Sequence, residues 1–228
     1  MNTGKMPLIL IAIITFLFTE SASAFSTGAD SAAYKQNPNY WLQTGLYNIY
    51  RTQHSNVVML GNSITHGVNW NELLGRNDVA ERGIPSDMVE GFLSRLDYIY
   101  KLNPKVCFIM GGINDIYSGF SVDTVFNEYV RVIRGLQNHN IIPVIQSTLF
   151  VSQKWHNARD KNPEVNKLNM LLKDYAAKNN ITFVDLIPQM THDGLLKDEL
   201  TYDGLHLNAN GYAIWREKLD QILNKMIQ

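Results

Sequence analysis

The stretch VVMLGNSITHG, residues 57–67, sets four apolar residues directly before a glycine, an asparagine and a serine. A short apolar run that ends in turn residues is typical of a strand buried on both faces of a parallel sheet. Ligands of such sheets bind beyond the carboxyl ends of the strands, so Ser63 is a candidate nucleophile. The alternative at this point is that Ser63 or Thr65 only caps the helix that follows.

The length and composition predict a folded chain of either one α/β domain or two very small domains. The chain has 228 residues, of which 45% are hydrophobic and 18% charged, and its formal net charge is -1. These values exclude a wholly disordered chain. Because the charge is nearly balanced, we expect no nucleic-acid partner and no electrostatic attraction to an anionic membrane. Cys107 is the only cysteine, so no intramolecular disulfide can form, and we expect a buried, inert thiol.

Residues 1–24 have the pattern of a cleavable signal peptide. Lys5 precedes an apolar run over 7–18, and alanine, serine and alanine at 22–24 form a small-residue cleavage signature. The alternative is an uncleaved anchor, for which the apolar run is short. We therefore predict export to the periplasm or the medium, with no stable membrane anchor on the mature chain.

Strands alternate with helices along the rest of the chain. This order predicts an α/β fold with a parallel sheet covered on both faces, a three-layer α/β/α sandwich of the flavodoxin-like kind over residues 56–228. Segment 25–55 is rich in aromatic residues and is predicted to be a helical lead-in that packs on this domain; alternatively, its rings line a substrate cleft. Asp87 and Glu90 resemble a capping pair. The predicted strands are 57–61, 79–82, 106–111, 141–146 and 182–185, and the predicted helices are 87–102, 122–138, 164–179 and 208–226.

Polar residues follow the predicted strands. Ser63 comes after the first strand, the turn 83–86 after the second and Asn114 after the third, while Asp203 and His206 come some way after the fifth. Because parallel strands bring their carboxyl ends to one edge of the sheet, we expect these residues to converge. A nucleophile, a base, an orienting carboxylate and hydrogen-bond donors are the groups that acyl transfer needs.

His206 is the candidate base. It lies three residues after Asp203 in a compact turn before the last predicted helix. Asp203 would accept the Nδ1 proton and fix the tautomer that leaves Nε2 free to take the proton of Ser63. The stretch 193–196 repeats the Asp-Gly-Leu start but carries leucine where the histidine is needed. His66 is close to Ser63 in sequence, but the same turn would point it away.

Other polar residues have two possible uses. Asn114 is either an oxyanion donor or a turn asparagine, and the backbone N–H of Gly83 is a further candidate donor. Asp115 is predicted to be a helix cap or turn partner rather than a catalytic acid. Trp155 and His156 either shape the leaving-group side of the site or form an ordinary surface loop. No cluster of residues has the spacing of metal ligands, so we predict no metal and no cofactor.

Together these residues resemble the SGNH hydrolases, also called the GDSL lipase/acylhydrolase family. Four family blocks occur in order between about residues 56 and 226. The resemblance is strongest to the branch of platelet-activating-factor acetylhydrolase catalytic subunits and carbohydrate O-acetylesterases. It implies that Ser63, His206 and Asp203 are catalytic, and that the N–H groups of Ser63 and Gly83 and the side chain of Asn114 form the oxyanion hole. The four blocks are 61–65, 81–84, 112–115 and 203–206.

One position departs from the family pattern. The family usually has aspartate where this chain has Asn62. Asparagine keeps the shape of the side chain but removes a negative charge beside the nucleophile.

The predicted function is an exported serine esterase that hydrolyses short-chain acyl esters, chiefly acetyl esters of carbohydrate. The alternatives are a lysophospholipase or thioesterase for longer acyl chains, a non-catalytic carbohydrate-binding protein of the same fold, and a nucleotide-binding Rossmann domain, whose Gly-x-Gly-x-x-Gly turn is not present at 61–66.

Overall fold

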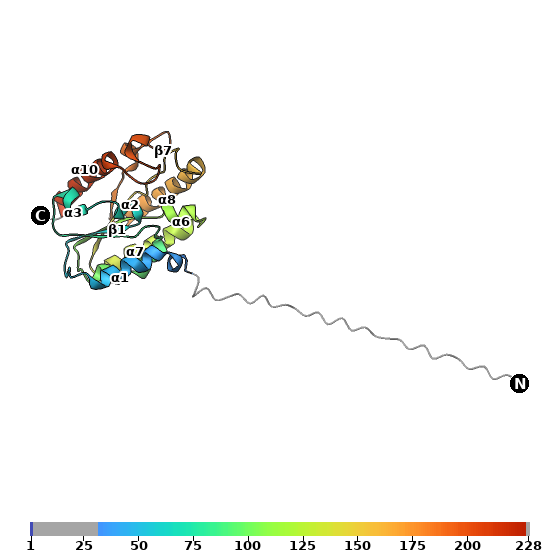
Figure 1. Cartoon of the computed structure of the whole chain (residues 1–228), viewed down its shortest axis with the longest axis horizontal. Coiled ribbons are helices and arrows are strands. Elements are labelled where there is room, and N and C mark those ends of the chain that lie inside the picture. The colour runs from blue at the N-terminus through green and yellow to red at the C-terminus, as the bar shows by residue number, and fades with distance from the viewer. Residues whose placement is uncertain (2–31, 227–228) are drawn as a thin grey trace. The chain divides into compact units, whose positions relative to one another are not determined.

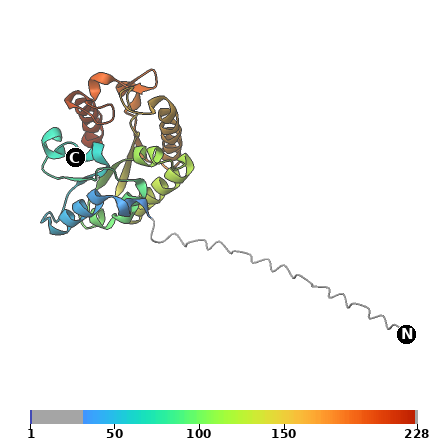
Figure 2. The ribbon, with the colours of Figure 1, turned by 45° about the vertical axis from the view of Figure 1, so that its right-hand side comes forward.

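Five parallel strands form the central sheet of the computed structural model, which describes Met1 and residues 32–226. Helix α7 (Val122–Asn138) lies on one side of the sheet, and helices α3 (Trp70–Leu74) and α10 (Ala209–Met226) lie on the other (Figures 1 and 2). The strands are β1 (Val57–Gly61), β2 (Val79–Gly83), β3 (Val106–Met110), β4 (Ile142–Gln146) and β5 (Thr182–Val184). Their order is β2-β1-β3-β4-β5, and all neighbouring pairs are parallel. The predicted fold class is confirmed.

The strand predictions hold to within one residue at each end. All five residues of β1 are buried, as expected for a strand with helices on both faces. In the register of the sheet, Gly61 lies opposite Gly83 of β2 and Met110 of β3. The three carboxyl ends therefore meet at one level, and the residues that follow them share one edge of the sheet. Cys107 lies in β3 as a buried free thiol, and burial raises its pKa.

The predicted helix 87–102 is wrong in one respect, because it is two short helices, α4 (Val89–Ser94) and α5 (Asp97–Tyr100). Asp87 does not form the predicted capping pair: its carboxylate turns inward and pairs with Arg95 at 2.8 Å. Arg95 lies between the two helices, and its side chain is fully buried. Asp87 and Arg95 are thus buried in the interior and do not lie on a solvent-facing helix surface.

Helix α8 (Ala158–Lys178) begins earlier than the predicted 164–179 and contains Pro163. Proline is typical of a helix start, but Pro163 lies inside this helix. Because proline has no backbone N–H, Pro163 removes only one helical hydrogen bond, close to the first turn of α8. The remaining elements are α2 (Ser63–His66), α6 (Ile113–Tyr117), α9 (Ile187–Met190), β6 (Thr191–His192), β7 (Leu195–Leu196) and the 3-10 helices η1 (Ala33–Gln36) and η2 (Asp198–Leu200).

The described part of the predicted lead-in contains η1 and helix α1 (Pro38–Ile49). Tyr40 and Tyr47 of α1 are buried and form a small cluster with Ile84, and Tyr47 Oη donates to the carbonyl oxygen of Gly83 at 3.2 Å. The helix therefore contacts the turn that follows β2. The predicted signal peptide and residues 25–31 of the lead-in lie outside the described residues.

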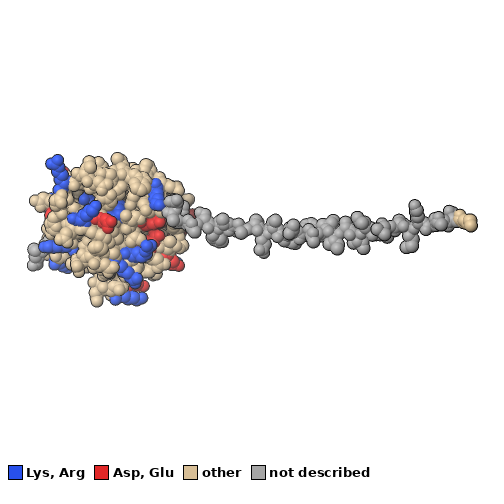
Figure 3. All heavy atoms as spheres, turned by 90° about the horizontal axis from the view of Figure 1, so that it is seen from below, with Lys and Arg blue, Asp and Glu red and all other residues tan. Residues whose placement is uncertain are grey.

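Charged side chains of both signs are interspersed on the face seen in Figure 3. This distribution agrees with a formal net charge of -1. Among the helices of residues 32–226, none has the length and apolar character that crossing a bilayer requires.

Candidate active site

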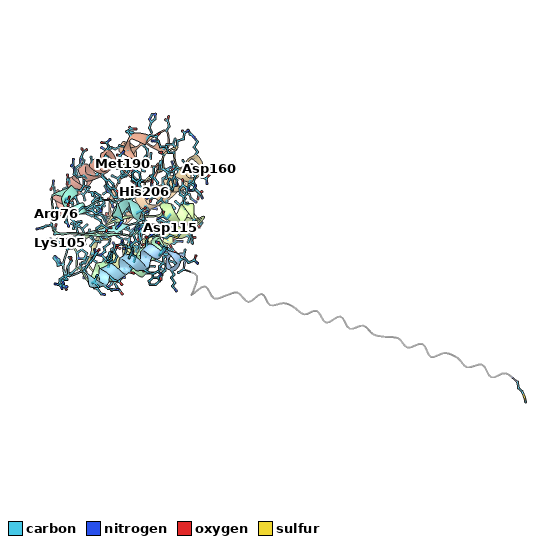
Figure 4. All side chains as sticks on the ribbon, viewed as in Figure 1. Arg76, Lys105, Asp115, Asp160, Met190 and His206 are labelled. Atoms are coloured by element: carbon cyan, nitrogen blue, oxygen red, sulfur yellow. The ribbon has the colours of Figure 1, made fainter. Side chains whose placement is uncertain are left out.

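The structure brings Ser63, His206 and Asp203 together at the edge of the sheet. Ser63 is the first residue of α2, directly beyond β1, and His206 lies in the loop before α10. His206 Nε2 is 2.9 Å from Ser63 Oγ, and His206 Nδ1 is 2.6 Å from Asp203 Oδ2. His206 lies beside α2 near the middle of the molecule (Figure 4). The three side chains thus form one continuous hydrogen-bonded line.

The Asp203 carboxylate is held by its own turn. Its Oδ1 accepts the backbone N–H groups of Leu205 at 2.9 Å and His206 at 2.8 Å, while Oδ2 faces the imidazole ring. Partial burial raises the pKa of Asp203, but the hydrogen bonds from the His206 ring and the two N–H groups outweigh it and hold the pKa below its usual range. The carboxylate therefore stays ionised and assigns the Nδ1–H tautomer to the histidine.

Asn62 caps α2, so the alternative that Ser63 or Thr65 is the cap is wrong. Asn62 Oδ1 accepts the N–H of Ile64 at 3.0 Å, which is the bond an aspartate would make at this position. The departure from the family residue therefore preserves the turn. Because Asn62 does the capping, the Ser63 hydroxyl is free to face His206.

Gly83 lies directly beneath this turn. A Cβ at residue 83 would come within 2.5 Å of the His66 backbone nitrogen, so only glycine lets α2 approach β2 this closely. The N–H of Gly83 donates to Glu81 Oε1, and Glu81 Oε2 lies 3.4 Å from His66 Nδ1. The predicted oxyanion donor is therefore engaged by a carboxylate in this arrangement. His66 pairs with Glu81, which raises the pKa of the imidazole, and it is not placed to serve Ser63.

Asn114 and Ser86 line one cavity next to the site. Asn114 Nδ2 donates one hydrogen to the carbonyl oxygen of Asp87 at 2.8 Å, and the amide keeps a second N–H for a ligand. Ser86 has a left-handed backbone, with φ 60°. This conformation is costly for a residue other than glycine and is concentrated at functional sites. The sequence carries no signal for it, since no glycine occupies the position.

Aromatic residues flank the imidazole. The ring of Trp155 meets that of His206 edge-on, with 6.5 Å between centroids, and the ring of Tyr202 stacks on it at 5.9 Å. Tyr117 Oη donates to the carbonyl oxygen of His156 at 2.9 Å, which ties the loop after β4 to α6. Trp155 and His156 thus border the site. The cavity has a volume of about 320 Å³ and is lined by Ser86, Met88, Ile113, Asn114, Tyr117, Ser118, Trp155, His156 and Leu205.

Asp115 is not the N-cap of its own helix, because Gly112 is the N-cap of α6 and Asp115 lies within the first turn. The predicted cap is therefore wrong there, and the side chain binds the start of α4 instead. Its Oδ1 accepts the N–H of Val89 at 3.0 Å, and its Oδ2 is buried without a hydrogen-bond partner. Burial raises the pKa of Asp115 to about 7. Asp115 lies on α6, away from the exposed Asp160 (Figure 4).

Asp115 should make the fold less stable as the pH rises. The ordinary pKa of an aspartate carboxyl is 3.8 and that of Asp115 in the folded chain is about 7, so between these values the folded chain holds a proton that the unfolded chain has released. Raising the pH through this window removes at most about 4 kcal/mol of unfolding free energy. Asp115→Asn mimics the neutral form, so urea unfolding should find it more stable than wild type at pH 8 and similar near pH 4. Asp160→Asn is the control, and an equal pH-dependent gain there would refute the assignment.

Metal ligands are not gathered anywhere in the described part of the chain: no group of three or more histidine, cysteine, aspartate or glutamate residues there could hold an ion. A larger cavity, of about 520 Å³, opens between α8 and the β6–β7 hairpin. Neither cavity is lined by Ser63, Asp203 or His206. The smaller cavity is lined by Leu205, the neighbour of His206 in the chain, and by Trp155, whose ring contacts that of His206, so it is the cavity next to the imidazole.

Solved structures share this fold. A Bacteroides fragilis protein assigned as an acylhydrolase is 26% identical, covers 84% of this chain and 98% of its own, and superimposes with a TM-score of 0.73. A GDSL-like lipase from Bacteroides thetaiotaomicron is 24% identical, with coverage of 82% and 98% and a TM-score of 0.71. An acetyl xylan esterase is 22% identical, with coverage of 73% and 98% and a TM-score of 0.63.

Curated relatives match over part of their length. An N-acylneuraminate cytidylyltransferase from Streptococcus agalactiae serotype III is 24% identical over 180 residues, which are 78% of this chain and 40% of the relative. Its serotype V counterpart is 28% identical over 117 residues, 50% of this chain and 27% of the relative. This chain thus spans less than half of either relative. The family model described as GDSL-like Lipase/Acylhydrolase matches residues 59–214, from the end of β1 to beyond the turn of His206. The chain belongs to that family as a carboxylic ester hydrolase of the SGNH type.

Proposed function

We propose that this hydrolase is a serine esterase with Ser63 as nucleophile, His206 as general base and Asp203 as the orienting carboxylate. The observation that carries the proposal is the 2.9 Å contact between Ser63 Oγ and His206 Nε2. A serine hydroxyl is a weak nucleophile until a base within hydrogen-bond reach removes its proton. Asp203, on the far side of the ring, stabilises the imidazolium that then forms.

The reaction runs in two steps. Ser63 Oγ bonds to the ester carbonyl carbon as its proton passes to His206 Nε2. The tetrahedral intermediate then breaks its bond to the alcohol oxygen, which takes the proton from His206 and leaves. Water, deprotonated by His206, attacks the acyl-serine in the same way, and the acid is released with Ser63 restored.

The oxyanion is assigned to the N–H of Ser63 and to Asn114 Nδ2. Ser63 is the first residue of α2, where the backbone N–H has no acceptor within the helix. Gly83 is the third donor that the family resemblance implies, and it would contribute only after Glu81 Oε1 has left its N–H. Ser86, in the wall of the cavity beside Asn114, is the alternative backbone donor.

The proposed substrate is a short acyl ester, chiefly acetyl, on a carbohydrate. The cavity of about 320 Å³ is at the small end of the range for ligand sites, which favours a short acyl group. The leaving alcohol must reach His206 Nε2, and the rings of Trp155 and Tyr202 both contact this imidazole. Such aromatic faces suit the C–H face of a sugar ring. The relatives add support, since one solved neighbour is an acetyl xylan esterase and the curated relatives are named for N-acylneuraminate, a sugar acid.

The proposed location is the periplasm or the medium. It is supported by the sequence pattern of residues 1–24, with a basic residue, a short apolar run and a small-residue cleavage signature. Cell fractionation of the full chain, with N-terminal sequencing of the mature protein, tests it. A mature chain that starts at Met1 and stays in the cytoplasm would contradict the proposal.

Acetyl esters should be hydrolysed faster than octanoyl esters. With the purified enzyme we expect kcat/KM on 4-nitrophenyl acetate to exceed that on the octanoate at least tenfold, because a cavity at the small end of the range for ligand sites favours the short acyl group. A preference for the octanoate would favour a lysophospholipase or thioesterase. Failure of a fluorophosphonate to label Ser63 would favour a non-catalytic binding protein.

The proposed contact of the sugar with Trp155 is tested by the same assay with an acetylated oligosaccharide as substrate. Trp155→Ala should lower kcat/KM on the sugar ester roughly 2- to 10-fold more than on 4-nitrophenyl acetate, since one ring contact is lost. Trp41→Ala, which removes an exposed tryptophan of α1, is the matched control. An equal effect on both substrates would remove the support for a carbohydrate.

A further inference from the structure

A buried ion pair lies behind the proposed oxyanion hole. Arg95 Nε is 2.8 Å from Asp87 Oδ2, and neither side chain is exposed to solvent. Burying two charges costs several kcal/mol per ion, and well-packed apolar residues usually stabilise a fold equally well. Stability alone therefore gives no reason for a charged pair here, and its other contacts supply one.

Arg95 ties together the ends of two strands. Its Nη1 donates to the carbonyl oxygen of Arg82 at 2.9 Å and its Nη2 to that of Gly61 at 3.0 Å. Because a peptide group is planar, fixing a carbonyl also fixes the N–H of the next residue. The two peptide groups held in this way continue into Gly83 and into Asn62, the residue before Ser63.

Asp87 connects Arg95 to the side chain of Asn114. Its carbonyl oxygen accepts Asn114 Nδ2 at 2.8 Å, its N–H donates to the carbonyl oxygen of Ile84 at 3.1 Å, and its Oδ1 accepts the N–H of Met88 at 3.0 Å. With Oδ2 bound to Arg95, each polar group of Asp87 has a partner. The direction of the Asn114 amide is thus set by a backbone that the guanidinium holds in place.

We propose that Arg95 is a positioning residue for the oxyanion hole, which it orients through Asp87 and through the carbonyl groups of Arg82 and Gly61. The inference rests on the proposed function of the site. Arg95 does not line the cavity and touches no substrate. Lysine cannot replace it, because its three N–H donors radiate from a single nitrogen, whereas the guanidinium reaches the three acceptors from three separate nitrogens, Nε, Nη1 and Nη2.

The test compares an oxygen ester with its sulfur analogue. In the thiono analogue of 4-nitrophenyl acetate, C=S replaces C=O, and sulfur is a weak hydrogen-bond acceptor. A formed oxyanion hole therefore favours the oxygen ester, and the ratio of the two rates does not depend on how much of the protein is folded. For Arg95→Lys we expect kcat on the oxygen ester to fall about 10- to 100-fold with KM nearly unchanged, and the oxygen-to-sulfur ratio to fall about tenfold.

Two control variants give the expected limits of the oxygen-to-sulfur ratio. Asn114→Ala removes a proposed donor and should lower the ratio. Arg76→Met breaks another Arg–Asp ion pair, a partly exposed one with Arg76 Nη2 2.8 Å from Asp78 Oδ2, at the opposite end of β2, and it should leave the ratio unchanged. If Arg95→Lys does not fold, Asp87→Asn takes its place with the same expectation.

The outcomes separate this inference from the proposed function. A folded Arg95→Lys variant with the wild-type ratio overturns the positioning role, as does an equal loss in Arg76→Met. If neither Arg95→Lys nor Asp87→Asn folds, the pair is structural and the inference is withdrawn. If the wild-type enzyme itself does not prefer the oxygen ester, the oxyanion hole of the proposed function fails instead.

Discussion

Ser63→Ala is expected to lower kcat/KM on 4-nitrophenyl acetate by about 10⁴-fold or more. The substitution removes the oxygen that lies 2.9 Å from His206 Nε2, so no acyl-enzyme can form. It should leave the fold intact, because Asn62 and not Ser63 caps α2. Initial rates, fluorophosphonate labelling and thermal melting of the same preparation measure the three consequences separately.

Ser94→Ala is the matched control for this variant. Ser94 is an exposed serine at the end of α4, so its replacement should change neither labelling nor turnover. Residual labelling of Ser63→Ala at the wild-type level would mean that another residue reacts. Undiminished hydrolysis by folded Ser63→Ala would remove the acyl-enzyme mechanism altogether.

The sheet is predictable from the sequence because its strands are buried on both faces. Residues 57–60 are each fully buried, and such a run of apolar residues has few other uses than an inner strand. Helix α7 is equally clear, since it begins at a serine cap and keeps one apolar face. These elements depend on local pattern and burial, which the sequence carries directly.

The division of segment 87–102 into α4 and α5 is not predictable in this way. Asp87 and Arg95 are polar residues on a helical spacing, and a sequence pattern assigns such residues to the solvent face. Their burial depends on acceptors that other segments provide, namely the carbonyl groups of Gly61 and Arg82. No local signal reports these long-range contacts.

The same distinction applies to the site. Ser63, Asp203 and His206 were predictable because each follows a recognisable turn, and the sheet brings the turns together. The donors of the oxyanion hole depend instead on the directions of single N–H groups. A glycine after β2 suggested an available N–H at Gly83, whereas the structure shows that N–H bound to Glu81. The left-handed backbone of Ser86 has no counterpart in composition or spacing.

Asp203→Asn is expected to lower kcat about 10³- to 10⁴-fold with little change in KM. Asp203 Oδ1 holds two backbone N–H groups, and the asparagine oxygen will keep these bonds. Its Nδ2 then faces His206 Nδ1, which must become an acceptor. The imidazole proton moves to Nε2, and a protonated Nε2 cannot accept the proton of Ser63.

The chain contains its own control for this variant. Asp193 begins a similar Asp-Gly-Leu turn with leucine in place of the histidine, and its side chain is largely exposed. Asp193→Asn should therefore leave turnover unchanged. If Asp203→Asn keeps wild-type kcat while the protein remains folded, the carboxylate does not set the tautomer of His206. The substitution keeps the two backbone hydrogen bonds of residue 203 and changes only the tautomer of His206. That result would therefore mean that Asp203 holds the turn together and that His206 acts as base without its help.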